Sequence, residues 1–244
     1  MLAGLVEPTS GSVELEGQAT VTPWARGRIG LLTEASALYE EHTPRGYLAF
    51  FADLYDVPDD VARQRSDRVL DRLSLSAEAR SQRIGTMSKG MRRKVALART
   101  LLHDPPVLLL DEPTSGLDPV TARELEDFVR ELRDDDKAVL LSAHDLAQVE
   151  ALCDEVLVMH EGRVQLRGSV PELREAAGAK RYTIRATSPF GGSSARGGAH
   201  EATVEAWPKV EDAIDEVRAD GGEVLEVESA LPGLDQVLRN LAEA

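Results

Sequence analysis

Two adjacent carboxylates, Asp111 and Glu112, follow an apolar run at residues 107–110. A short run of branched apolar residues is typical of a strand that is buried on both faces of a parallel sheet. In open α/β sheets, ligands bind at the carboxyl ends of such strands. Two acids in that place suit a magnesium–nucleotide site, where one carboxylate holds Mg²⁺ through water and the next polarises an attacking water. A strand that ends in a helix cap before Pro113 is the structural alternative.

His144 follows a second apolar run, at residues 138–141. A single histidine in such a turn usually has a structural role. This strand should lie next to the strand that ends at Asp111, so the imidazole can reach the same ligand. The other four histidines have no comparable setting, and we assign them no role: His42, His103, His160 and His200.

A loop from Ser115 to Asp118 comes shortly after the two acids. We expect Asp118 to cap the helix that begins at Pro119, since aspartate is a good N-cap and proline fits the first helical position. Because the loop adjoins Asp111 and Glu112, it is also a candidate part of the ligand site.

A candidate anion site lies at Ser88, Lys89 and Gly90, which open a predicted helix. Free backbone N–H groups and the helix dipole favour an anion at a helix N-terminus. The first turn carries basic residues, which oppose the dipole, so a bound anion would relieve the conflict. A helix capped by Ser88, with a basic first turn and no ligand, is the alternative.

The elements around these motifs follow an α/β pattern. Apolar runs at 107–110, 138–141 and 156–159 alternate with predicted helices near 120–134 and 145–152. Such alternation predicts a parallel sheet with helical crossovers. Further predicted strands lie at 12–17, 28–32 and 162–166, and further helices at 43–54, 58–73, 88–102 and 170–177.

The sequence changes character beyond Ala179, where we predict a small appendage of order β-β-α-β-α. Its predicted strands lie at 182–185, 202–205 and 223–227, and its helices near 208–219 and 232–242. A glycine-rich stretch at 188–198 is expected to be a loop. So short a segment would be marginally stable alone. We therefore predict two domains, at residues 1–178 and 179–244.

Composition narrows the class of protein. The chain has 28 Lys+Arg against 43 Asp+Glu, a formal net charge of −15, which argues against nucleic-acid binding because phosphates require a basic face. A single cysteine, Cys153, excludes an intramolecular disulfide framework and fits a reducing compartment. No apolar stretch reaches about 18 residues, and residues 1–5 do not look like a signal peptide. We therefore expect a cytoplasmic protein.

Taken in order, these motifs resemble those of the ATP-binding subunits of ABC transporters. Residues 107–112 are similar to the Walker B strand, which implies that Asp111 binds Mg²⁺ and that Glu112 is the catalytic carboxylate. The loop that ends at Asp118 is similar to the D-loop. His144 is similar to the switch histidine, which implies a contact with the γ-phosphate.

Ser88, Lys89 and Gly90 resemble the family's signature motif. That motif normally has two glycines after its serine, and a lysine in the first of these places is familiar in the subgroup that serves ABC-2-type exporters. The strand before Glu34 is similar to the lid-loop strand, with glutamate where the family usually has glutamine. The resemblance implies that these residues, together with Asp118, bind the nucleotide and its metal-bound water.

The resemblance covers about residues 1–175. It implies a P-loop-NTPase-like α/β core with a helical subdomain at about 36–103, followed by a small α+β C-terminal domain. The core is expected to be truncated at its N-terminus, because none of the five lysines follows a glycine and the Gly-x-x-x-x-Gly-Lys-Ser/Thr loop is therefore absent. Residues 1–5 resemble the helix directly after that loop. Either the start site is placed too late or the gene has lost its 5′ end, and the nearly whole remaining motifs favour the first.

The family implies an ATP-hydrolysing subunit of an ABC-2-type exporter, with ATP and Mg²⁺ as cofactors. Its expected partners are a membrane permease and a second ATPase subunit, in a homodimer or heterodimer at the inner face of the cell membrane. An aromatic cluster at 39–55 would line a groove for a permease helix or form a small local core. The transported substrate would be chosen by the membrane subunit.

Two alternatives remain at this point. Without the phosphate loop we expect no hydrolysis by this chain alone, so it can be a catalytically incompetent fragment or a non-catalytic partner that donates Ser88 and Gly90 in trans. The translation-factor branch of the family needs two nucleotide domains and basic RNA contacts, and both length and charge oppose it.

Overall fold

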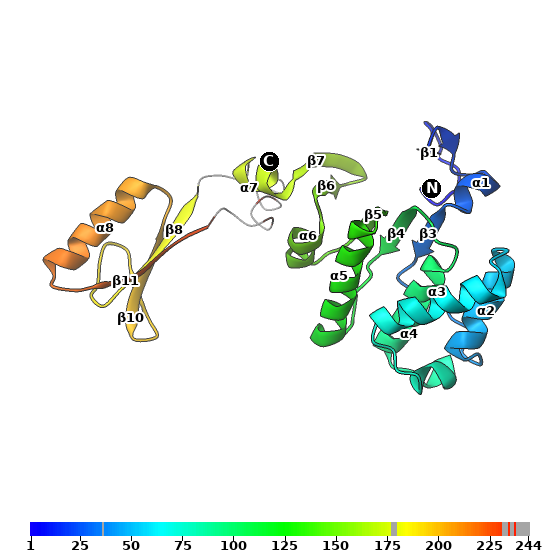
Figure 1. The fold of residues 1–244 in the computed structure, drawn as a ribbon. Coiled ribbons are helices and arrows are strands. Elements are labelled where there is room, and N and C mark those ends of the chain that lie inside the picture. The colour runs from blue at the N-terminus through cyan, green and yellow to red at the C-terminus, as the bar shows by residue number, and fades with distance from the viewer. Residues whose placement is uncertain (36, 177–179, 231–233, 235–236, 238–244) are drawn as a thin grey trace. The chain divides into compact units, whose positions relative to one another are not determined.

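The structure is a computed structural model that describes residues 1–35, 37–176, 180–230, 234 and 237. Contacts divide the chain into two units, Met1–Gln148 and Val149–Ala244, and each is described by itself (Figure 1). The predicted domain boundary after residue 178 and most of the predicted helix at 232–242 fall outside the described residues. No helix within the described part of the chain has the length and apolar character needed to cross a membrane.

A three-stranded parallel sheet forms the centre of the first unit. Its strands are β3 (Ile29–Leu32), β4 (Val107–Asp111) and β5 (Ala138–Ser142), in the order β3-β4-β5. The pairing sets Asp111 opposite Ser142 at the carboxyl edge. Helix α5 (Pro119–Asp134) connects β4 to β5 and lies beside them (Figure 1). The predicted α/β core with a parallel sheet is therefore confirmed.

Three helices fill the segment between β3 and β4. They are α2 (Pro44–Leu54), α3 (Asp59–Arg72) and α4 (Lys89–Leu101), with short 3₁₀ turns η1 (Ala79–Ser81) and η2 (Ile84–Thr86) before α4. Their shared core includes Tyr47, Leu48, Leu70, Ile84 and Val95. These side chains are buried because each helix carries its apolar residues on one face.

The aromatic residues at 39–55 divide between this core and the surface. Tyr47 is fully buried, whereas Tyr39, Phe50 and Tyr55 are exposed. The rings contact one another at centroid distances between 4.8 Å (Tyr47 to Phe51) and 6.4 Å (Phe51 to Tyr55). The cluster therefore forms a local core, and part of it also faces solvent.

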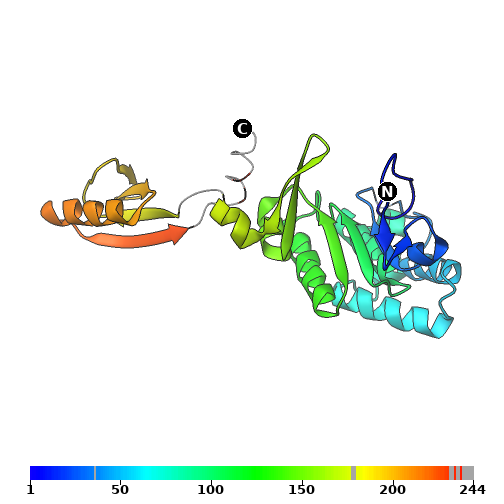
Figure 2. The same cartoon turned by 90° about the horizontal axis from the view of Figure 1, so that it is seen from above.

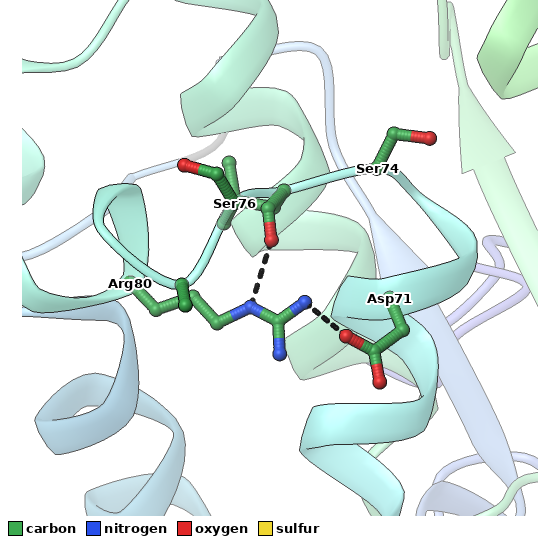
Figure 3. A pocket seen from close by; sticks show the side chains of 6 residues that line it. Asp71, Ser74, Ser76 and Arg80 are labelled. Carbon is green, nitrogen blue, oxygen red and sulfur yellow. Dashed lines mark hydrogen bonds and ion pairs between the residues drawn. The ribbon is translucent and has the colours of Figure 1, made fainter.

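Arg80 fixes the loop between α3 and η1. Its side chain is only 6% exposed, and its Nε donates a hydrogen bond of 2.8 Å to the carbonyl oxygen of Leu75. Its Nη2 lies 2.5 Å from Asp71 Oδ1 on α3. Figure 3 shows these contacts beside a shallow recess of about 310 Å³ that Ser74 and Ser76 also line. The arginine thus ties the loop to the end of α3.

The N-terminal segment is less regular than its sequence suggests. Residues 1–5, which resemble part of a helix, form turns, and the Gly4 N–H donates to the Met1 carbonyl oxygen at 2.8 Å. The predicted strand at 12–17 is the hairpin of β1 (Glu14–Leu15) and β2 (Gln18–Ala19). A short helix, α1 (Pro23–Arg26), follows before β3.

The second unit begins within α6 (Leu146–Leu152) and continues with a hairpin. Strand β6 (Glu155–His160) pairs antiparallel with β7 (Arg163–Ser169), and α7 (Val170–Ala176) follows. The prediction that 156–159 is a buried strand of the parallel sheet is wrong, since Met159 is 65% exposed. Glu161 and Gly162 both have positive φ, 47° and 74°, and such a two-residue turn favours local pairing.

A second small sheet ends the described chain. Its strands are β8 (Arg181–Ala186), β9 (Ser194–Arg196), β10 (Ala199–Val204) and β11 (Val224–Ala230), in the antiparallel order β11-β8-β10-β9. Helix α8 (Trp207–Ala219) packs against this sheet through Val210 and Val217 (Figure 2). The predicted strands and the helix at 208–219 lie where expected, and β9 is an additional strand within the predicted glycine-rich loop.

We expect Gly30→Ala to destabilise the first unit by about 1–3 kcal/mol, because overpacking a close contact forces side chains or backbone to shift. A Cβ at Gly30 would lie 2.7 Å from both Leu108 Cδ2 and the Thr100 carbonyl oxygen. Urea unfolding can be followed by Trp24 fluorescence in a Trp207→Phe background, since the chain has only two tryptophans. The urea midpoint should fall.

Gly46→Ala is the matched control for this substitution. Gly46 lies inside α2, and its added Cβ would meet nothing closer than 3.4 Å. Alanine is the better helix former, so the midpoint should stay or rise. Equal midpoints for Gly30→Ala and the parent would contradict the close-packing argument.

Candidate functional site

The carboxyl ends of β4 and β5 bring the predicted acids together with Ser142. The Ser142 hydroxyl donates a 2.6 Å hydrogen bond to Asp111 Oδ1 and accepts one of 3.1 Å from the Glu112 N–H. The Glu112 N–H also lies 3.2 Å from the Ser142 carbonyl oxygen. One serine side chain therefore orients both carboxylate residues at this edge of the sheet.

Glu112 and His144 form a direct pair. His144 Nδ1 lies 2.7 Å from Glu112 Oε2. The Glu112 side chain is 23% exposed, whereas the His144 side chain is 75% exposed, so the pair opens to solvent on the histidine side. The arrangement holds a carboxylate beside a ring nitrogen where a water can reach both. This is the geometry expected of a group that orients a nucleophilic water.

A recess of about 400 Å³ adjoins the pair. It is lined by Glu112, His144, the loop at 114–117, residues of α5 and Gln148. Gln148 Nε2 donates a 2.6 Å hydrogen bond to Thr114 Oγ1, which fixes the start of the loop. The loop that the sequence assigned to the candidate site therefore does border Glu112 and His144.

Asp118 has the structural role that the sequence predicted. Its Oδ1 accepts a 3.0 Å hydrogen bond from the Thr121 N–H, and its backbone is extended, as an N-cap residue requires. The Thr121 backbone hydrogen bond favours the ionised form and lowers the pKa of the Asp118 carboxyl below its ordinary value. This anchors the C-terminal end of the loop on α5.

The start of α4 contacts the same loop and α5. Ser88 caps the helix by accepting a 3.2 Å hydrogen bond from the Met91 N–H. Gly90 is buried, and a Cβ there would lie 2.8 Å from Thr121 Cγ2. A side chain at Gly90 would therefore disturb the packing within one chain. The structure thus gives Ser88 and Gly90 internal roles in capping and packing.

Lys89 also faces the loop. Its ammonium group lies so close to Gly116 that a Cβ at Gly116 would come within 2.2 Å of Lys89 Nζ. Gly116 has a φ of 65°, a left-handed conformation that glycine adopts without strain. The lysine therefore occupies the space beside the loop that a larger residue at 116 would fill.

Glu34 lies in the turn after β3 with its side chain exposed. Its main chain is connected to the acids through Arg93, because its carbonyl oxygen accepts a 3.1 Å hydrogen bond from Arg93 Nη1. The same nitrogen donates to the Thr33 carbonyl oxygen at 2.6 Å. The turn after β3 is thus joined to α4.

Arg93 is the residue that the sequence interpretation missed. Its Nε donates to the Pro113 carbonyl oxygen at 2.8 Å, and its Nη2 donates to those of Asp111 at 2.7 Å and Glu112 at 2.6 Å. The basic first turn of α4 was interpreted from the sequence as favouring a bound anion, and Arg93 was given no role of its own. A signal was nevertheless present, because the positions three and four residues away, Gly90 and Leu97, are small or apolar and buried.

The charge of Arg93 lies in a buried setting. Burial lowers the pKa of its guanidinium, while the carboxylates of Asp111, Glu34 and Glu112 act in the opposite direction. The neighbouring Lys94 pairs separately with Glu124 on α5, at 2.5 Å. The positive charge next to the main chain of Asp111 and Glu112 is therefore that of Arg93 and not that of Lys94.

Asp111 is the carboxylate at this edge of the sheet that could hold a metal ion. No group of three or more His, Cys, Asp and Glu side chains within the described residues could enclose a metal ion. Mg²⁺ does not need such a cage, since it usually takes one or two carboxylates together with waters and substrate phosphates. Asp111 is exposed, and its Oδ1 is already oriented by Ser142. The residues present therefore fit a magnesium ion held with a nucleotide.

Comparisons with known proteins agree with this architecture. Residues 1–115 match the ABC transporter family. The ABC transporter ATP-binding protein NatA of Bacillus subtilis is 37% identical over 179 residues, which cover 72% of this chain and 72% of NatA. The Nod factor export ATP-binding protein I of Burkholderia pseudomallei is 35% identical over 178 residues, covering 72% of this chain and 58% of that protein.

A solved structure supports the same assignment. The structure described as the ATP binding subunit of an ABC transporter has a TM-score of 0.65 at 30% identity, over 72% of this chain and 73% of that one. Some relatives are considerably longer, and the chain spans 52% of one and 61% of another. The similarity in sequence and in fold shows that the chain belongs to the family of ABC transporter ATP-binding proteins.

Proposed function

We propose that this chain is the ATP-hydrolysing subunit of an ABC-2-type exporter. The observation that carries the proposal is the Glu112–His144 pair, 2.7 Å apart at the ends of adjacent strands and next to Asp111. Lys89 in the signature position supports the exporter subgroup, as does the similarity to a protein named for Nod factor export. The substrate would be chosen by the permease with which the subunit works.

Glu112 has the main chemical role in this proposal. Its Oε2 is held by His144, which leaves Oε1 to accept a hydrogen bond from a water and orient it toward the γ-phosphate. His144 is exposed enough to contact the same phosphate through its other ring nitrogen. Asp111, oriented by Ser142, would hold Mg²⁺, and the bound ion would offset the negative charge of the phosphates.

Assembly completes the proposed site. Ser88 and Gly90 would face the nucleotide of a second ATPase subunit, where the N–H groups at the start of α4 favour an anion. Glu34 would reach a metal-bound water of its own site. A permease would bind at the membrane, and the exposed part of the aromatic cluster is the proposed contact. The phosphate loop is not among these 244 residues and would have to be supplied for hydrolysis.

The 244-residue chain by itself should bind ATP very weakly and hydrolyse none measurably. A phosphate loop supplies most backbone N–H contacts to the β- and γ-phosphates and a lysine charge, and no Gly-Lys pair occurs in this sequence. Phosphate release by the purified chain measures this directly. Turnover that Glu112→Gln abolishes would contradict the prediction. Normal assembly with a hydrolysing subunit, without any turnover at this chain's own site, would instead support the non-catalytic alternative.

In the assembled transporter, with the phosphate loop restored to this subunit, Glu112→Gln should lower kcat on the order of 100-fold or more while ATP affinity is retained, since an amide keeps the shape but cannot polarise water. Steady-state ATPase assays and nucleotide binding measure the two effects separately. Glu126→Gln is the matched control, because Glu126 is a carboxylate that lines the same recess from α5. Equal rates for the two variants would show that Glu112 is not the catalytic carboxylate.

A further inference from the structure

Arg93 connects two loops that the sequence treated separately. We propose that Arg93 is a positioning residue of the hydrolytic site, which holds the end of β4 and the turn after β3 in one arrangement through hydrogen bonds to their main chains. The inference rests on the proposed function, in which Glu112 orients the attacking water. It adds a residue that contacts neither water nor phosphate but fixes the group that does.

The guanidinium group is matched to its acceptors. It has five N–H donors in a rigid plane, and it donates to five carbonyl oxygens at 2.6–3.1 Å. Two acceptors belong to the turn after β3, at residues 33–34, and three belong to residues 111–113. Lysine has three donors on one nitrogen, so it cannot reach both loops at once.

Burial makes these contacts hard to replace. Arg93 is only 6% exposed, so water cannot readily satisfy the five carbonyl oxygens if the guanidinium is lost. Hydrogen bonds from an ionised donor are also stronger than neutral ones. The loops are therefore held by this side chain rather than by solvent.

The backbone of Glu112 shows what the contacts support. Glu112 has a φ of 45°, a left-handed conformation that is unfavourable for a residue with a side chain. Such conformations persist only where several neighbours fix them. Here the N–H of Glu112 is bound by Ser142 and its carbonyl oxygen by Arg93. Removing Arg93 frees the carbonyl end and allows the carboxylate to move away from its place beside His144.

The position of Arg93 also connects the site with the start of α4. Ser88 caps this helix, and Arg93 lies five residues later, about 7.5 Å along the axis. A helix is rigid over that distance. A shift of α4 on contact with a nucleotide at its N-terminus would therefore be transmitted to residues 111–113 and 33–34 together.

Arg80 provides a matched control within the same unit. It is also 6% exposed and also donates to a main-chain carbonyl oxygen, that of Leu75. Its other partners are Asp67 and Asp71 on α3, and it contacts neither loop of the site. Arg80→Lys therefore reproduces the loss of stability expected from altering a buried arginine, while it leaves the contacts of Glu112 unchanged.

The first experiment uses NMR on the 244-residue chain. In the parent protein, a guanidinium bound at all three nitrogens rotates slowly, so the Nη protons of Arg93 should give separate resonances. In Arg93→Lys, the Glu112 amide should exchange with solvent about tenfold faster than in Arg80→Lys, after correction for global stability. Averaged Nη resonances in the parent, or equal Glu112 exchange in the two variants, would overturn the proposal. If Arg93→Lys does not fold, the Nη resonances of the parent still test whether the Arg93 guanidinium is held by its acceptors.

The second experiment measures ATPase activity in the assembled transporter, with the phosphate loop restored to this subunit. Arg93→Lys should lower kcat on the order of 100-fold with KM within about threefold, because misplacement of a reacting group by about 1 Å costs that much. Arg80→Lys should match the parent per folded molecule. Unchanged kcat in Arg93→Lys would overturn the positioning role. A parent without Glu112-dependent turnover would contradict the proposed function instead, while the exchange data would still decide whether Arg93 holds the loop.

Discussion

Five carbonyl oxygens from two loops converge on one buried guanidinium, and the candidate site depends on that convergence. The parallel sheet alone sets only where β3 and β4 end. It does not fix the chain beyond those ends, where carbonyl groups lose their strand partners. Arg93 supplies these partners from α4, the helix that Ser88 caps. The helical part of the unit therefore contributes directly to the geometry of the carboxylates.

The sheet accounts for the part of the site that could be predicted from sequence. Parallel strands direct their carboxyl ends to one edge, so the residues after two adjacent apolar runs were expected to meet. Glu112 and His144 do so at 2.7 Å. The caps at Ser88 and Asp118 were equally predictable, because an N-cap depends on residues only three positions apart.

Long-range interactions account for what the sequence did not reveal. Arg93 and Thr33 are 60 residues apart, and no local pattern states that their loops converge. The run at 156–159 shows a related limit. Its apolar composition suited a buried parallel strand. Composition does not determine which strand it pairs with, however, and the turn at Glu161 and Gly162 favours pairing with β7. Local turn geometry decided the outcome there.

The start of α4 shows that one residue can satisfy two constraints at once. Gly90 was placed by the sequence in a candidate anion site, yet a Cβ there would already collide with Thr121 on α5. The packing leaves little room for a side chain at position 90 before any ligand is considered, and it brings the α4 N-terminus against the helix that Asp118 caps. Lys89 lies against Gly116 of the same loop. An anion that bound at the start of α4 would therefore act on a helix already packed against the loop beside Glu112, which links the residues that would face the second subunit's nucleotide with the carboxylates of this chain's own site.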